Sequence, residues 1–89
     1  MTTPRMSVVM PVYNVEAYIE EAIQSVLDQS FEDFELIIVD DGGPDGSIEL
    51  ARQFRDPRIR IISQANRGLA GARNTGIAHA RAPYIALLD

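Results

Sequence analysis

Eighty-nine residues, 46% hydrophobic and 24% charged, have the composition of an ordinary globular protein and the length of one domain or part of one. The net charge of −5 argues against a general nucleic-acid binder, because such a protein needs a basic face to displace counterions from phosphates. All eight basic residues are arginine, and there is no cysteine and one histidine, which excludes lysine chemistry, thiolate metal sites and histidine clusters. No apolar run approaches the ~20 residues that a membrane span requires.

Four segments of strand pattern alternate with three segments of helical pattern, after a polar leader at residues 1–5 that we expect to be disordered. The first two strand segments are unbroken apolar runs, typical of strands buried on both faces. The third alternates arginine with isoleucine, which indicates an edge strand with Arg58 and Arg60 facing solvent. In chain order the elements are strand 6–11, helix 15–29, strand 34–39, helix 45–54, strand 58–63, helix 69–80 and strand 84–88.

Helical crossovers between strands predict an α/β, Rossmann-like sheet, mostly parallel, in the order 3-2-1-4. Asn14 and Asp45 are expected to cap the first and second helices. Glu16 and two further glutamates lie early in the first helix, where they would complement its dipole. Arg81 is expected to interact in the same way with the C-terminal end of the third helix.

Polar residues follow the strands where the chain leaves the sheet, and in open parallel sheets ligands bind at that edge. Tyr13 could present its ring to a flat ligand such as a nucleobase, although a strand-exit turn with a helix cap explains the same segment equally well. Asp40 and Asp41 are adjacent carboxylates that would repel each other, and neither is needed as a helix cap. They favour a functional role, since a carboxylate can accept from a base N–H or a ribose hydroxyl.

The segment 66–74 combines glycines with two arginines at the start of a helix. Helix N-termini and arginines both favour phosphate. Small residues are equally suited to tight packing of the helix on the sheet, and for this segment alone packing is the favoured interpretation. Asp89 follows the last strand, as a further strand-end carboxylate or simply the last residue.

Four segments taken together resemble the amino-terminal, nucleotide-binding half of the family 2 inverting glycosyltransferases, which have the GT-A fold. The segments are residues 7–14, 31–47, 66–76 and 84–89. The resemblance covers residues 6–89 and implies a partial GT-A domain that stops at the first Asp of an Asp-x-Asp motif. One departure is local: Gly43 and Pro44 follow Gly42 where the family usually has Gly-Ser.

The resemblance implies roles for single residues. Tyr13 would stack near the base, Asp41 would accept its imide N–H, and Asp89 would lie near the ribose or a metal-bound diphosphate. The substrate-binding residues implied in this way are Pro11, Tyr13, Asp40, Asp41, Arg73 and Asp89, with Asp89 also the implied metal ligand.

For the full-length protein the resemblance implies transfer of a sugar from a nucleotide sugar, UDP-linked, to an acceptor hydroxyl on a glycan, lipid or other molecule, with inversion. Mg²⁺ or Mn²⁺ would bind the diphosphate, and the catalytic base would lie outside these residues. This chain alone is therefore expected to hold no catalytic residue and to be inactive. The resemblance also implies a cytoplasmic location, with membrane association of the full-length protein. It further implies a role in the synthesis of a cell-envelope polysaccharide.

Two other classes fit strand-end carboxylates. A receiver-like signalling domain ordinarily has a lysine beside its acidic cluster, and this chain has none. A dinucleotide-binding domain should have Gly-x-Gly-x-x-Gly after its first strand, where Pro11 and Tyr13 stand here. Finally, residues 84–88 form an apolar edge strand, from which we expect self-association and marginal stability.

Overall fold

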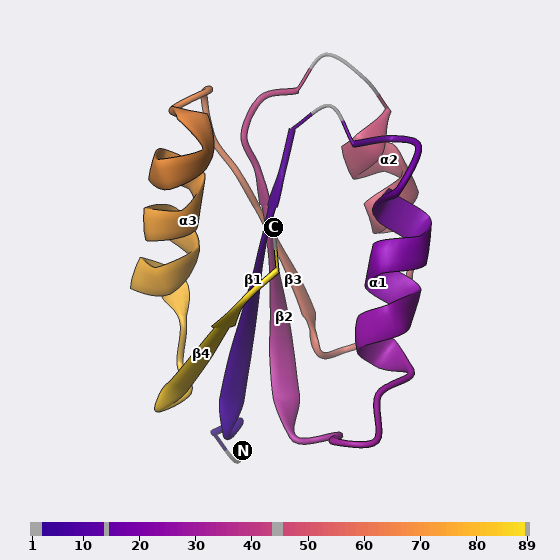
Figure 1. The fold of residues 1–89 in the computed structure, drawn as a ribbon, viewed down its shortest axis with the longest axis vertical. Coiled ribbons are helices and arrows are strands. Elements are labelled where there is room, and N and C mark those ends of the chain that lie inside the picture. The colour runs from indigo at the N-terminus through magenta and orange to yellow at the C-terminus, as the bar shows by residue number, and fades with distance from the viewer. Residues whose placement is uncertain (1–2, 14, 44–45, 89) are drawn as a thin grey trace.

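The computed structural model describes residues 3–13, 15–43 and 46–88. Four strands form one sheet in the order β3-β2-β1-β4, and every neighbouring pair is parallel. The predicted strand order is confirmed, with β3 and β4 at the edges. In chain order the elements are β1 (Met6–Val12), α1 (Ile19–Leu27), β2 (Phe34–Asp40), α2 (Ser47–Arg52), β3 (Ile59–Ser63), α3 (Gly68–His79) and β4 (Tyr84–Leu87) (Figure 1).

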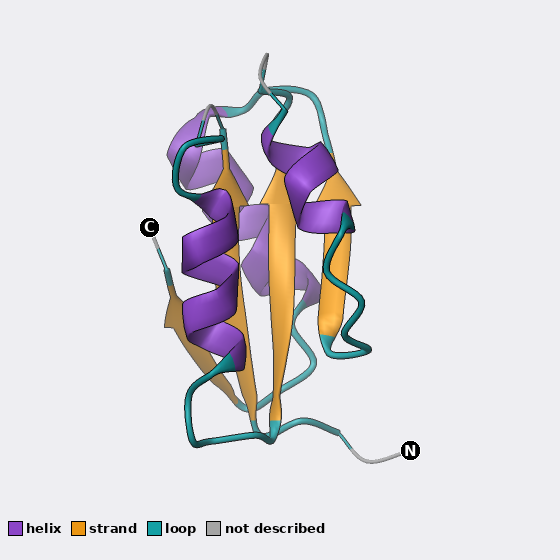
Figure 2. Cartoon of the chain, turned by 90° about the vertical axis from the view of Figure 1, so that its right-hand side faces the viewer, coloured by secondary structure: helices purple, strands orange, loops and turns teal. Residues whose placement is uncertain are grey.

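The helices cover the two faces of the sheet unequally. Helices α1 and α2 lie on one face and α3 on the other (Figures 1 and 2). Because side chains alternate along a strand, Val8 and Met10 pack toward α1, while Ile37 and Val39 pack toward α3. The two central strands are apolar along most of their length, at Val8–Val12 and Leu36–Val39, because both of their faces are covered. Within the described residues, no helix is long and apolar enough to cross a membrane.

Helix α1 begins later than predicted. The expected helix 15–29 is replaced by a turn that leads into Ile19–Leu27, with Tyr18 at the N-cap position and no side-chain cap. The backbone N–H of Val15 donates to Ser47 Oγ at 3.0 Å, so a residue 32 positions away fixes the chain before α1. The proposed cap Asn14 lies outside the described residues.

Glu16 does not lie in α1 as expected. Its Oε1 accepts from the backbone N–H of Gly46 at 3.0 Å, at the N-cap position of α2. The turn before α1 is thereby tied to the start of α2, while the first turn of α1 keeps Glu20 and Glu21 as predicted. The proposed α2 cap, Asp45, lies outside the described residues.

A buried carboxylate joins the amino ends of the strands. Glu35 is 2% exposed and accepts from Ser7 Oγ at 2.5 Å, from Arg60 Nη1 at 2.7 Å, and from the backbone N–H and Nε of Arg81 at 2.7 and 3.1 Å. Burial by itself raises the pKa of Glu35, but the hydrogen bonds from Ser7, Arg81 and Arg60 outweigh it and lower the pKa to about 2.

The expected roles of two arginines are therefore wrong. Arg60 does not simply face solvent: besides Glu35 it donates to the carbonyl of His79 at 2.9 Å, at the C-terminal end of α3. Arg81 binds Glu35, so the interaction with the helix end that was expected of Arg81 is made by Arg60. A carboxylate buried inside β2 attracts both guanidinium groups, and the sequence pattern of β3 alone does not reveal it.

Arg58 also lies against the protein. Its guanidinium stands 4.4 Å from the centroid of the Phe34 ring and forms a salt bridge of 2.8 Å with Asp56. The hydrogen bond from Arg58 lowers the pKa of Asp56. Arg58 therefore covers the start of β2 with its charged end toward the surface.

The tight-packing interpretation holds for the face of α3 that meets the sheet. Ala72 and Gly76 are buried against the central strands. A Cβ at Gly76 would lie 2.3 Å from Val9 Cγ1, closer than side chains can approach, and 3.3 Å from Val39 Cγ2, tighter than an ordinary contact. The glycine lets α3 approach the sheet closely enough to bury these two valines.

Candidate functional site: a pocket at the carboxyl edge of the sheet

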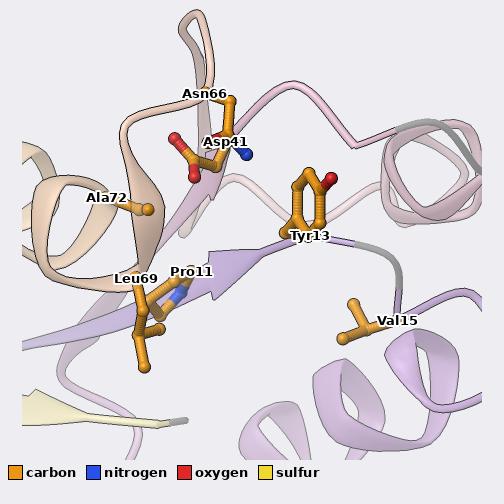
Figure 3. Close-up of a pocket in the computed structure, with 8 residues that line it drawn as sticks. Pro11, Tyr13, Val15, Asp41, Asn66, Leu69 and Ala72 are labelled. Carbon is orange, nitrogen blue, oxygen red and sulfur yellow. The ribbon is translucent and has the colours of Figure 1, made fainter.

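The candidate site is a pocket of about 480 Å³ where β1 and β2 end and α3 begins. Its volume lies in the range of small-molecule sites, which is roughly 300–1,000 Å³. Figure 3 shows Tyr13 on one side and Leu69 and Ala72 of α3 on the other, with Asp41 between them. The lining residues are Pro11, Tyr13, Val15, Asp41, Asn66, Gly68, Leu69 and Ala72.

Asp41 is the charged group of this pocket. Its backbone N–H donates to the carbonyl of Val12 at 3.0 Å, which extends the pairing of β1 with β2 by one residue. The residue is 2% exposed, and its Oδ1 accepts from Gln64 Nε2 and from the backbone N–H of Arg67, each at 2.9 Å. A buried acceptor is thus held in place at the end of β2.

Asp40 has a different environment, because adjacent residues of a strand point to opposite sides. Its Oδ1 accepts from the backbone N–H of Gly42 at 3.2 Å, and its Oδ2 accepts from Ser63 Oγ at 3.3 Å. Asp40 shapes the turn after β2 and links it to β3. It is not among the residues that line the pocket.

Gly42 brings the segment after β3 next to Asp41. Its φ of +76° is in the left-handed region, which side chains disfavour. A Cβ there would also lie 3.2 Å from the backbone nitrogen of Asn66 and 3.4 Å from the carbonyl oxygen of Gln64. The glycine therefore serves both the turn and the close approach of residues 64–66.

Gln64 and Thr75 were not among the residues predicted from the sequence. Gln64 directly follows β3, and its backbone N–H donates to the carbonyl of Asp40 at 2.9 Å. Thr75 Oγ1 lies 2.5 Å from Gln64 Oε1, on the side away from Asp41. The strand-end rule that selected Asp40 and Asp41 applies equally to Gln64 and could have found it.

The structure brings together Pro11, Tyr13 and Asp41, three of the six predicted substrate-binding residues. Tyr13 is half exposed, which leaves part of its side chain accessible to a ligand. Arg73 lies on α3, partly buried, and does not line the pocket. Asp89 lies outside the described residues.

The segment at the start of α3 lines the pocket, and the helix also packs on the sheet, while phosphate binding by this helix start stays a prediction. Asn66, Gly68 and Leu69 line the pocket, while Gly76, further along α3, packs on the sheet. Ala72 contributes to both.

Metal ligands do not gather within residues 3–13, 15–43 and 46–88: no three His, Cys, Asp or Glu side chains there could hold an ion together. The predicted metal ligand, Asp89, is not among these residues.

The pocket can bind a flat, mostly apolar group that carries an N–H donor. The apolar side chains of Pro11, Leu69 and Ala72 and the ring of Tyr13 surround the space, and Asp41 offers an acceptor from within it. A nucleobase has this shape and polarity, since its faces are apolar and its hydrogen-bonding groups lie at its edge.

The fold and this pocket define an open α/β domain that binds its ligand at the carboxyl edge of a parallel sheet. A family model described as glycosyl transferase family 2 matches residues 7–89. The chain belongs to this family. The family excludes the receiver-like and dinucleotide-binding alternatives.

Individual relatives agree with this assignment. The chain is 53% identical over 88 residues to the glycosyltransferase EpsJ of Bacillus subtilis, covering 97% of this chain and 26% of EpsJ. The structure of Staphylococcus aureus TarS 1–349 in complex with UDP superposes with a TM-score of 0.88 at 27% identity, over 96% of this chain and 27% of that one. Mannosyltransferase PcManGT from Pyrobaculum calidifontis, with GDP-Man and Mn²⁺, gives a TM-score of 0.79 at 29% identity, over 90% and 25%.

The neighbours confirm the expected GT-A type of fold. This chain spans about a quarter of the length of EpsJ and of the matched TarS and PcManGT chains.

Proposed function

We propose that this chain binds the nucleotide of a sugar donor, uridine diphosphate or a UDP-linked sugar, with the base in the pocket between Tyr13 and α3. The observation that carries the proposal is the buried Asp41 carboxylate among apolar side chains, because a base imide N–H is the donor such an acceptor needs. The UDP complex of TarS supports a uridine nucleotide.

In this arrangement each residue has a distinct task. The Tyr13 ring stacks on the base, the side chains of Pro11 and Leu69 exclude water from its faces, and Asp41 accepts the imide N–H. The diphosphate and sugar extend out of the pocket. We propose that this chain is the donor-binding part of a longer glycosyltransferase domain, whose other residues provide the acceptor site and the base.

The proposed reaction of the whole protein is attack of an acceptor hydroxyl on the anomeric carbon, with inversion and departure of the nucleoside diphosphate. A divalent cation, Mg²⁺ or Mn²⁺, would stabilise the negative charge on that leaving group. The Mn²⁺ in the PcManGT structure supports this cofactor, and Asp89 is the proposed ligand from this chain.

We propose a glycan or lipid acceptor in synthesis of a cell-envelope polysaccharide. One relative supports it by its name: the B. subtilis protein TuaG, 43% identical over 89 residues, is named as a putative teichuronic acid biosynthesis glycosyltransferase. We propose that the reaction takes place in the cytoplasm, with membrane association of the full-length protein.

Titration with UDP, followed by NMR of the backbone amides, tests the donor site. Wild-type shifts should concentrate at the amides of Val12, Tyr13 and Asp40–Gly43, beside Pro11, which has no amide proton. Asp41→Asn should weaken UDP binding by about 1–3 kcal/mol, because the acceptor of the base N–H is lost. Asp33→Asn, an exposed aspartate at the other end of the sheet, is the matched control and should bind as the wild type does. Shifts confined to surfaces remote from both segments would reject this placement.

We also propose self-association through the β4 edge. Tyr84, Ile85 and Leu87 are exposed large hydrophobic side chains on a strand that pairs on one side with β1. Such an edge is a template for a further strand. Sedimentation over a concentration series should show association, and Ile85→Lys should suppress it by placing a charge on the edge. A strictly monomeric wild-type chain that melts cooperatively above about 65 °C would contradict this proposal.

A further inference from the structure

We propose that Gln64 is a specificity-determining positioning residue of the donor site. Together with Thr75 it fixes which oxygen of Asp41 meets a bound base, and so selects bases that carry an imide N–H. This inference rests on the proposed function, because it assumes that a base occupies the pocket beside Asp41.

The two oxygens of Asp41 have different surroundings. Oδ1 accepts two hydrogen bonds of 2.9 Å, from Gln64 Nε2 and from the backbone N–H of Arg67. A carboxylate oxygen has two lone-pair sites, so these donors fill Oδ1. In the part of the chain that the structure describes, no other residue donates to this carboxylate, which leaves Oδ2 as the oxygen for a ligand.

The orientation of the Gln64 amide follows from its two neighbours. Oε1 lies 2.5 Å from Thr75 Oγ1, whose hydroxyl can donate, and Nε2 lies 2.9 Å from Asp41 Oδ1, which can only accept. The opposite orientation would place the amide oxygen against a carboxylate oxygen. The Thr75 hydroxyl has one proton and two acceptors within reach, Gln64 Oε1 at 2.5 Å and the carbonyl of Gly71 at 3.0 Å, and the shorter contact is with Gln64. The carboxylate of Asp41 therefore sets the orientation of the Gln64 amide, Thr75 supports it from the other side, and Gln64 in turn holds Asp41 Oδ1. The backbone N–H of Gln64, bound to the carbonyl of Asp40, holds the residue at the end of β3.

A pocket with a fixed acceptor discriminates between bases. Uracil at N3 and guanine at N1 carry an N–H that can donate to Asp41 Oδ2. Cytosine at N3 and adenine at N1 carry a lone pair instead, which would face the carboxylate without a proton between them. A site built for a hydrogen bond rejects an analogue that lacks the donor strongly, so we expect UDP to bind at least about thirtyfold more tightly than CDP.

The test exchanges the hydrogen-bond donors and acceptors of Asp41 and Gln64 and compares the Kd values of UDP and CDP for each variant. In Asp41→Asn, the donors Gln64 Nε2 and Arg67 N–H keep the amide oxygen at the Oδ1 position, so the Asn amide NH₂ faces the pocket. It can donate to cytosine N3, and the variant should prefer CDP to UDP. Adding Gln64→Glu replaces one of these donors with a charged acceptor. A charge-assisted hydrogen bond from the Asn NH₂ to the introduced carboxylate is stronger than the remaining neutral bond from the Arg67 N–H, so the Asn oxygen should turn toward the base and restore the preference for UDP. A double variant with Gln29→Glu, an exposed glutamine beyond α1, is the matched control and should keep the CDP preference.

Each outcome decides. If the wild-type chain binds neither nucleotide, the proposed function is wrong and this inference fails with it. If the wild-type chain binds UDP but Asp41→Asn still prefers UDP, only this inference is wrong. The same holds if adding Gln64→Glu leaves the CDP preference of Asp41→Asn unchanged. Where the Gln64→Glu double variant does not fold by its NMR spectrum, Thr75→Val in the Asp41→Asn background decides instead. Loss of the Thr75 hydroxyl should relax the CDP preference toward equal affinities, and an unchanged preference overturns the role of Gln64.

Discussion

Replacing Glu35 with glutamine should lower the free energy of unfolding by about 3 kcal/mol. The carboxylate is 2% exposed and carries hydrogen bonds from Ser7, Arg60 and Arg81, and its pKa is lowered from 4.5 to about 2. Glutamine keeps the shape but removes the charge that both guanidinium groups bind. Urea denaturation at neutral pH measures the change.

The matched control is Asp56→Asn, which removes a carboxylate from the more exposed pair with Arg58. Surface pairs contribute about 0–1 kcal/mol, so this variant should remain near wild-type stability. If Glu35→Gln and Asp56→Asn lowered the free energy of unfolding equally, the burial of Glu35 would not explain its contribution to stability.

The contribution of Glu35 to the free energy of unfolding should also depend on pH, and it should decrease as the pH falls. The folded-state pKa of about 2 lies below the ordinary value of 4.5, so the folded protein binds the proton less readily than the unfolded chain. The stabilisation is therefore complete above pH 4.5 and is lost as the pH falls toward 2. The stability difference between wild type and Glu35→Gln should shrink over this interval in urea titrations at stepped pH. A difference that stays constant down to pH 2 would contradict the assignment.

Replacing Gly76 with alanine should destabilise the fold by about 2 kcal/mol, although alanine is the better helix former by about 1 kcal/mol. The added Cβ would lie 2.3 Å from Val9 Cγ1, so α3 must move away from the sheet. Val9→Ala in the same chain removes that methyl group. The double variant should therefore lose less than the sum of the two single losses.

Asn74→Ala is the control for helix propensity, because Asn74 is exposed on the same helix. It should leave stability unchanged or raise it by a few tenths of a kcal/mol. Thermal and urea unfolding of the four variants give the comparison. Additive losses for Gly76→Ala and Val9→Ala would show that these two residues do not limit the approach of α3.

Much of the fold could be predicted from the sequence because the apolar pattern reports burial directly. The unbroken runs in β1 and β2 placed both strands at the centre, and the alternation in β3 placed it at an edge. The start of α1 could not be predicted, since the N–H of Val15 is bound by Ser47 from a distant part of the chain. Local propensity contains no information about such a partner.

In the candidate site, too, some residues could be predicted from the local sequence and others depend on distant partners. Tyr13 and Asp41 could be found because they follow strands whose carboxyl ends meet at one edge. Thr75 could not, because it acts on Asp41 only through Gln64, and that contact requires α3 to pack at a particular position on the sheet. Arg60 and Arg81 were misassigned for the same reason, since their partner Glu35 is a charged residue in an otherwise apolar strand.

Strand β2 carries Glu35 near its beginning, and Asp41 directly follows its end. Six residues of extended chain separate them, which corresponds to about 20 Å. At that distance, substitutions usually add without coupling. The end of the strand that anchors the fold and the end that meets the ligand can therefore change independently. Related proteins could acquire a new donor preference by exchanging a few residues around Asp41, while the arginine-bound carboxylate at the other end keeps the same scaffold intact.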